Sequence, residues 1–178
     1  MDYRPNISAM LWFAQEVMPL LRQNFRTPRL WIVGMNPARS VRDLAGPDIC
    51  VTGRVPDVRP YLRHARVVVA PLGVARGIQN KVIEAMAMGC PIVVTPQVAE
   101  SLPGHSDDVV LTAATPEQFA EAVLRVMRGE YLYAGARARE YALTHFRWGE
   151  QLAGLDRLLE ADTSSLVAAH GLALMANR

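Results

Sequence analysis

The sequence predicts an α/β fold: a doubly wound parallel sheet in a single domain. Short apolar runs alternate with segments that carry apolar residues at helical spacing, an order typical of a parallel sheet with helices on both faces. The run at 67–72 is apolar throughout and rich in β-branched residues, as in a strand buried on both faces. A chain of 178 residues is long enough for one such domain and too short for two of ordinary size.

Turn and capping signals place the individual elements. Asn6 is expected to cap a long amphipathic helix over 7–25. Thr115, followed by a proline and then by Gln118, indicates a helix over 116–127. The other expected strands are 30–33, 49–52, 92–95 and 109–111; the other helices are 41–44, 58–64, 77–88, 131–144 and 149–160, with a loop over 96–107. The domain is expected to occupy residues 1–161, followed by a poorly ordered tail over 162–178.

Composition argues against several classes of function. A net charge of +2 is too small to indicate nucleic-acid binding. Cys50 and Cys90 have no metal-ligating neighbours in the sequence and are expected to be reduced core residues. No aspartate pair indicates a metal site, and no three-glycine turn indicates a nicotinamide or flavin cofactor. Because no apolar run reaches membrane-spanning length and no signal peptide begins the chain, a cytoplasmic location is expected.

The helix expected after the run at 67–72 carries polar groups on an otherwise apolar surface. Gly77, Asn80, Lys81 and Glu84 follow the spacing that places residues along one stripe, and Lys81 is the only lysine of the chain. A glycine at a helix start lets a ligand approach the backbone, and the free amides there attract anions. The stripe therefore fits a nucleotide diphosphate, but it also fits an ordinary crossover helix whose polar side faces water.

The segment 77–93 reads Gly-Ile-Gln-Asn-Lys-Val-Ile-Glu-Ala-Met-Ala-Met-Gly-Cys-Pro-Ile-Val. It resembles the donor-binding segment of family-four-type glycosyltransferases, and more narrowly that of sugar transferases associated with bacterial exopolysaccharide export. The likeness runs from residue 1 to about residue 159. It implies the glycosyltransferase B fold, in which two Rossmann-like domains face each other across a cleft. The likeness covers only the carboxy-terminal domain, which holds the nucleotide-sugar.

The resemblance implies a role for each candidate residue. Glu84 matches the second glutamate of the family's paired-glutamate motif, which binds the ribose, whereas Arg76 stands where the first glutamate is expected. The resemblance also implies that the backbone of Gly53, Arg54 and Val55 contacts the base. The helix start itself indicates that Gly77 and the amides of Ile78, Gln79 and Asn80 face the diphosphate. Lys81 is expected at the leaving phosphate, and an arginine at position 76 can face the same phosphate oxygens although the family has a glutamate there. The donor is expected to be linked to uridine diphosphate, without a metal or resident cofactor.

The resemblance also implies that the first strand of the domain is absent. The relatives begin this domain with a strand that runs directly into the segment matching Met1–Asn6, where this sequence starts. That strand is central in a doubly wound sheet. Its neighbours, expected at 29–34 and 66–71, would have to close up or borrow a strand. We therefore expect either a rearranged sheet or a strand supplied by another chain.

Three functions remain open on the sequence. The first is the donor-binding half of a retaining glycosyltransferase in exopolysaccharide or related glycan synthesis. It would need an amino-terminal acceptor domain or partner chain, and a lipid-linked acceptor would bring it to the inner face of the membrane. The second is a non-catalytic nucleotide-binding or assembly module that works with a partner chain, and the third is an inactive fragment. A homo-oligomer is compatible with each.

Overall fold

The computed structural model describes residues 3–75, 77–104 and 106–146. Nearly all of these belong to one compact unit that ends at Ala142. The predictions for Arg76, for the helix at 149–160 and for the tail at 162–178 lie outside the described residues.

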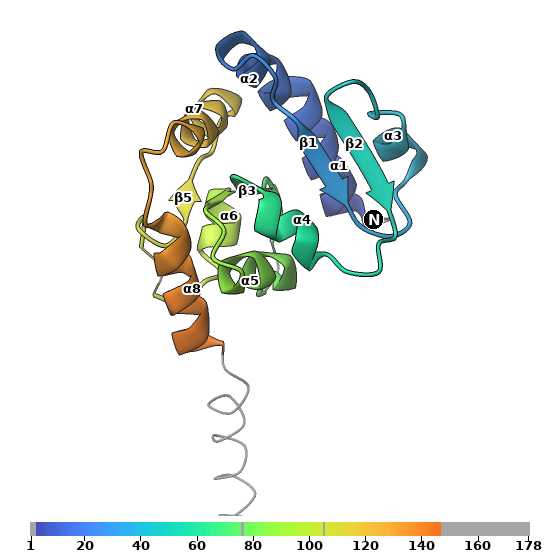
Figure 1. Cartoon of the computed structure of the whole chain (residues 1–178). Helices are drawn as coiled ribbons and strands as arrows, with labels where there is room; N and C mark the ends of the chain where they lie inside the picture. The colour runs from blue at the N-terminus through green and yellow to red at the C-terminus, as the bar shows by residue number, and fades with distance from the viewer. Residues whose placement is uncertain (1–2, 76, 105, 147–178) are drawn as a thin grey trace, which may run out of the picture. The chain divides into compact units, whose positions relative to one another are not determined.

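Helices and strands alternate along the described chain, which confirms the α/β fold (Figure 1). In order, the elements are α1 (Arg4–Trp12), η1 (Phe13–Val17), α2 (Met18–Asn24), β1 (Leu30–Val33), α3 (Arg39–Arg42), β2 (Ile49–Gly53), α4 (Arg59–His64), β3 (Val68–Ala70), α5 (Asn80–Ala87), β4 (Ile92–Val94), α6 (Pro96–Ala99), β5 (Leu111–Thr112), α7 (Pro116–Met127) and α8 (Ala134–His145).

The strands form two parallel sheets instead of one. In the first sheet β1 pairs with β2, with Leu30 opposite Ile49. In the second, β4 lies between β3 and β5, with Val68 of β3 opposite Ile92. No pairing joins β1 to β3 within the described residues. The predicted single sheet is therefore interrupted, and the interruption falls between the two strands that were expected to flank the absent one.

The first helix begins earlier than predicted and contains a wider turn. It starts at Arg4 after Tyr3, so Asn6 lies inside its first turn instead of capping it. The amide of Met18 bonds to the carbonyl of Phe13, the five-residue step of a π-helix. The next residue, Pro19, has no amide to donate and its ring crowds the preceding turn, which accounts for the wider turn at this point.

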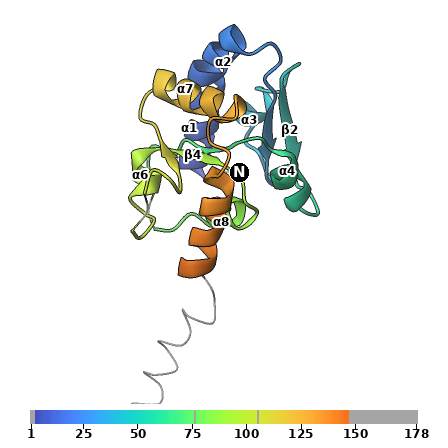
Figure 2. The same ribbon diagram turned by 60° about the vertical axis from the view of Figure 1, so that its left-hand side comes forward.

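One apolar core joins the two sheets. Phe119 of α7 meets Trp12 and Phe13 edge-on, with ring centroids 5.6 and 5.9 Å apart. The same buried cluster contains Ile32 of β1 and Val93 of β4. Figure 2 shows α2 and α7 side by side, and α7 also contacts η1 and the strands β4 and β5.

The helix α8 packs closely on the end of α5. A Cβ on Gly135 would lie 2.0 Å from the carbonyl oxygen of Gly89, so the two backbones touch. Arg139 donates to the carbonyl of Ala87 in the last turn of α5. The hydroxyl of Tyr141 donates to the carbonyl of Pro103 over 2.6 Å. This packing holds the carboxyl end of α5 in place.

Two further local predictions are wrong. The segment 96–107 was expected to be a loop, but it begins with the short helix α6, whose first amides bond to the carbonyl of Thr95. Cys50 was expected in the core, yet it is exposed on β2, whereas Cys90 is buried. Burial raises the pKa of the Cys90 thiol.

Candidate functional site

The candidate residues follow strands β2 and β3. Gly53 ends β2, with Arg54 and Val55 directly after it, and α5 is the helix that follows β3. Parallel α/β sheets bind ligands beyond the carboxyl ends of their strands. The amide of Gly34 donates to the carbonyl of Gly53 over 3.3 Å, which holds the ends of β1 and β2 together.

The turn before α5 depends on a glycine. Gly77 has a φ of +68°, in the left-handed region, and apart from its chain neighbours no described residue has an atom within 4 Å of the position that a Cβ would occupy. The side-chain amide of Gln79 donates to the Gly77 carbonyl over 3.1 Å and braces the turn. The backbone at Gly77 is therefore open to a ligand.

The helix α5 starts later than the sequence predicted. Gln79 is its N-cap and Asn80 its first residue, so the unpaired amides that open the helix belong to Asn80 and Lys81. Ile78 precedes the helix, with a side chain that is 49% exposed. The sequence predicted that the free amides would be those of residues 78–80, but they lie later in the chain. Lys81 therefore offers both its backbone amide and its ammonium at the helix start.

Lys81 meets a residue from the other end of the domain. Its ammonium donates to the side-chain oxygen of Asn6 over 2.5 Å. Partial desolvation lowers the pKa of Lys81 below the ordinary value of a lysine. No carboxylate of the described residues pairs with Lys81. The ammonium is therefore a positive charge that a bound anion can neutralise.

Glu84 lies one turn further along α5 and is exposed. In the described chain its carboxylate has neither a hydrogen-bond partner nor an ion pair, so both oxygens can accept from a ligand. Asn6, Lys81 and Glu84 all line one cavity of about 1080 Å³ that lies between β1 and β3. The structure therefore brings these three residues to one place.

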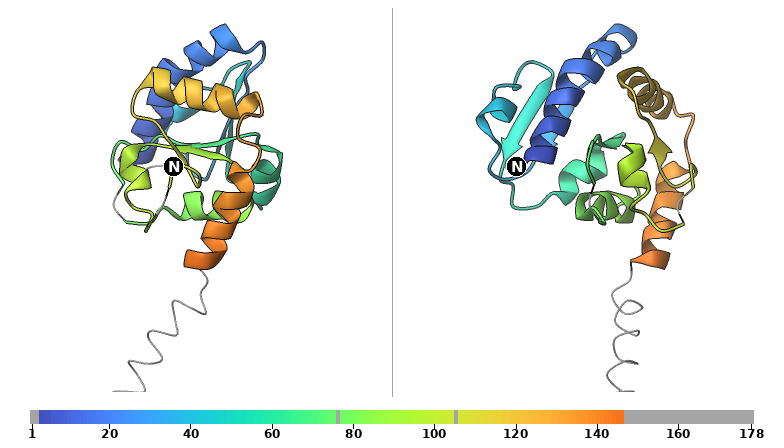
Figure 3. Two further views of the ribbon diagram at one scale, coloured as in Figure 1. Left: turned by 90° about the vertical axis from the view of Figure 1, so that its left-hand side faces the viewer. Right: turned by 180° about the vertical axis from the view of Figure 1, so that it is seen from behind.

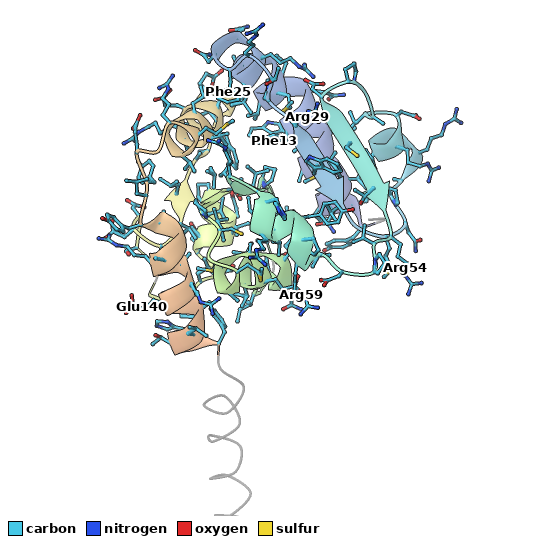
Figure 4. All side chains as sticks on the ribbon, viewed as in Figure 1. Phe13, Phe25, Arg29, Arg54, Arg59 and Glu140 are labelled. Atoms are coloured by element: carbon cyan, nitrogen blue, oxygen red, sulfur yellow. The ribbon has the colours of Figure 1, made fainter. Side chains whose placement is uncertain are left out.

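The residues at the end of β2 that were predicted to contact the base are not bonded to α5 within the described chain. Arg54 is exposed and extends away from the ribbon (Figure 4), whereas Val55 is half-buried. No hydrogen bond or ion pair between described residues joins Gly53, Arg54 or Val55 to α5. Arg76 is not among the described residues.

Sequence reasoning missed the part that Asn6 plays. Its position after Pro5 indicated a helix cap, which is the commonest use of asparagine there. Its actual partner, Lys81, is 75 positions away. The fold brings the first turn of α1 to the start of α5, and this proximity cannot be read from local sequence.

No group of three metal-ligating side chains converges within the described residues. None of the described helices combines the length and the apolar character that crossing a membrane requires.

Comparison with known proteins identifies the family of this chain. A search of curated proteins found no significant relative. The profile of the family described as "Glycosyl transferases group 1" matches residues 1–129, which is well over half of the chain. The matched region contains α1, the segment after β2, and α5 with its candidate residues. The chain therefore belongs to the group 1 glycosyltransferases.

Proposed function

We propose that this chain is the donor-binding half of a retaining glycosyltransferase that takes its sugar from a nucleotide diphosphate carrier, with uridine as the base. Membership of the family supports glycosyl transfer. The single observation that supports nucleotide binding is the cluster at the start of α5. There the ammonium of Lys81, held by Asn6, and an exposed helix start lie one turn from the open carboxylate of Glu84.

The proposed chemistry follows from the leaving group. When the bond from the sugar to the phosphate breaks, negative charge develops on the phosphate oxygens of the nucleotide diphosphate. A cation and backbone amides that face those oxygens stabilise the transition state more than the ground state. Lys81 and the amides that open α5 supply such groups. We assign the same role to Arg76.

The remaining residues have binding roles in this proposal. Gly77 lets the diphosphate approach the backbone, because no described residue beyond its chain neighbours fills the space where a Cβ would lie. Glu84 accepts hydrogen bonds from the ribose hydroxyls. The backbone of Gly53, Arg54 and Val55 contacts the base. The acceptor sugar, on a growing exopolysaccharide or its lipid-linked carrier at the inner face of the membrane, is held by a separate amino-terminal domain or partner chain.

Titration calorimetry with uridine diphosphate tests the proposal directly. We expect saturable binding that is weaker by about 1–3 kcal/mol in Glu84→Gln, because the amide cannot accept from two hydroxyls as a carboxylate does. Glu16→Gln is the matched control, since Glu16 is also an exposed helical carboxylate and lies on η1, away from α5. It should bind as the unchanged chain does.

Guanosine diphosphate separates base recognition from diphosphate binding. If it binds as well as uridine diphosphate, the assignment of uridine is wrong while the diphosphate site stands. If a folded chain binds neither nucleotide, or if Glu84→Gln and Glu16→Gln weaken binding equally, the donor site proposed on α5 is wrong.

A second function is supported by the cavity beside the site. Asn6, Lys81 and Glu84 line a space bounded by two unpaired strand edges, so a partner that fills it would also touch the site. This favours a non-catalytic nucleotide-binding or assembly module that works with a partner chain and binds nucleotide without turning it over. Nucleotide binding without transfer of sugar, in the presence of an acceptor domain, would distinguish this module from the enzyme.

A further inference from the structure

The contact between Asn6 and Lys81 fixes the orientation of the Asn6 side chain. An ammonium only donates hydrogen bonds, so the Asn6 atom that lies 2.5 Å from Nζ of Lys81 is the carbonyl oxygen, Oδ1. The side-chain amide is planar and carries its NH2 group on the same carbon as this oxygen. With Oδ1 on the ammonium, the nitrogen Nδ2 is held on the other branch of the amide, where it can only donate.

The Nδ2 group of Asn6 is not used by the part of the protein that the structure describes. Of the hydrogen bonds between described residues, the one that involves this side chain ends on Oδ1. Asn6 is the third residue of α1, so no carbonyl of that helix precedes it by four positions. Asn24 on α2 has such a carbonyl, and its nitrogen donates to Leu20 over 2.9 Å. The position of Asn6 thus leaves two N–H donors for a ligand.

These donors face the candidate site. Asn6 is half-buried and lines the cavity that Lys81 and Glu84 also line. Figure 3 shows the arrangement from two sides: the chain start marked N lies by the end of α1 that is closer to α5, and α2 lies at the opposite end. The ammonium of Lys81 and the Nδ2 group of Asn6 are therefore neighbouring donors, joined through one oxygen.

A neutral amide is the right partner for a cation that has to bind an anion. A carboxylate in place of Asn6 would pair with Lys81 and cancel its charge, whereas the amide oxygen holds the ammonium and leaves the charge in place. Hydrogen bonds in a chain also polarise one another. The ammonium draws electron density toward Oδ1, so the N–H groups at the other end of the amide become better donors to a negative ligand.

We propose that Asn6 binds the diphosphate directly: its Nδ2 group donates to a phosphate oxygen while its Oδ1 holds the Lys81 ammonium beside that oxygen. This inference rests on the proposed nucleotide site on α5. It gives Asn6 a contact of its own in addition to its hold on Lys81. Two donors that are 75 positions apart in the chain then close on one anion.

A double-mutant cycle with uridine diphosphate separates a direct contact from an effect through Lys81. Asn6→Ala should weaken binding about tenfold, because it removes both a donor to a charged acceptor and the hold on Lys81. In a chain that already carries Lys81→Ala, the same change should still weaken binding about threefold, since Nδ2 donates without the ammonium. If Asn6→Ala has no effect in that chain, Asn6 acts only through Lys81 and the direct contact is wrong.

The variant Asn6→Asp keeps an acceptor for Lys81 and replaces the N–H donors by a negative charge. It should therefore weaken the binding of uridine diphosphate more than Asn6→Ala does. Binding as tight as that of the unchanged chain would mean that the hold on Lys81 is all that Asn6 supplies. The matched control is Asn24→Ala, since Asn24 is an exposed helical asparagine that does not line the cavity. Equal weakening by Asn24→Ala and Asn6→Ala would contradict the proposal.

Inorganic pyrophosphate presents the anion without the base or the ribose. In competition with uridine diphosphate, pyrophosphate should bind about tenfold more weakly to Asn6→Ala than to the unchanged chain. Glu84→Gln should not weaken it, because the ribose that Glu84 is proposed to bind is missing from this probe. If Asn6→Ala weakens the nucleotide and not pyrophosphate, the amide contacts another part of the nucleotide and the proposal is wrong.

Nuclear magnetic resonance of the asparagine side chains observes the contact without any change to the site. The sequence contains five asparagines, so a chain labelled with ¹⁵N in this residue gives few NH2 signals. The signal that disappears in Asn6→Ala should shift when pyrophosphate is added, whereas that of Asn24, which already donates to Leu20, should not. An unchanged Asn6 signal at saturating pyrophosphate would overturn the proposal.

The outcomes distinguish the role of Asn6 from the donor site as a whole. If uridine diphosphate binds and Glu84→Gln weakens it, but the Asn6 signal and the cycle show no direct contact, the donor site stands and the role of Asn6 is wrong. If the folded chain binds neither uridine diphosphate nor pyrophosphate, the donor site itself is wrong and the role of Asn6 is wrong with it.

Discussion

Lys81 is the residue whose environment differs most from what its sequence position suggests. Its ammonium bonds to Asn6 and is partly desolvated, and this desolvation lowers its pKa. Desolvation disfavours the charged form, whereas a bound diphosphate would favour it. The proposed affinity for nucleotide is therefore coupled to the protonation of this lysine.

This coupling predicts a specific pH dependence. Affinity for uridine diphosphate should be complete below the pKa of Lys81 in the free protein and should fall as the pH rises through it. Because that pKa is lowered, the fall should begin at a lower pH than for an ordinary lysine. Calorimetry from about pH 7 to about pH 10 measures it. Lys81→Arg remains charged over this range, and the same fall in that variant would assign the effect to another group.

Gly135 is constrained by packing and not by its own backbone angles. Its φ does not require glycine, yet an added Cβ would meet the Gly89 carbonyl at 2.0 Å. Gly135→Ala should therefore push α8 from α5 and lower the free energy of unfolding by about 1–3 kcal/mol. Urea denaturation measures the loss. Gly46→Ala is the control, since its nearest neighbour would be 3.9 Å away, and it should have little effect.

Among the helices, α7 has the most complete start signal. The hydroxyl of Thr115 accepts from the amide of Gln118 over 3.3 Å, and the side chain of Gln118 accepts from the amide of Thr115 over 3.4 Å. Thr115→Ala should cost about 0.5–2 kcal/mol in urea denaturation, because the helix loses its cap. Thr115→Ser keeps a hydroxyl and should retain most of the stability. Equal losses in both variants would mean that the methyl group matters and not the cap.

Elements set by local signals were predictable, and elements set by distant contacts were not. Thr115 and Gln118 lie close in sequence, and their reciprocal bonds were expected from spacing alone. Gly89 was expected to end α5 and has a φ of +73° there. In contrast, the contact of Asn6 with Lys81 depends on the packing of α1, which no local pattern specifies.

The exact start of α5 was also not predictable from the sequence pattern. The stripe of Gly77, Asn80, Lys81 and Glu84 was identified from spacing, yet the helix begins only at Asn80. Gly77 and Gln79 form a turn in place of the first helical turn, because the left-handed backbone at Gly77 is incompatible with a helix. Helix boundaries near a glycine are set by such turns, and periodicity does not detect them.

At the scale of the whole molecule, the two sheets share a core even though they do not share hydrogen bonds. Ile32 and Val93 belong to the same buried cluster, joined through η1 and α7. We therefore expect the sheets to unfold together. Variants that keep either Trp12 or Trp31 as the only tryptophan should give the same urea midpoint by fluorescence, and this midpoint should match circular dichroism. Separate midpoints would show that the helices do not couple the sheets.

β1 and β3 each have an edge without a neighbouring strand among the described residues, and this has a consequence for the protein as a colloid. Apolar strand edges that lack a neighbour can pair with any extended chain, including partly unfolded copies of the same protein. The formal net charge of +2 supplies little repulsion between molecules. Self-association should therefore increase steeply with concentration. Light scattering over a range of protein concentrations would connect the architecture of the two sheets to the solubility of the whole chain.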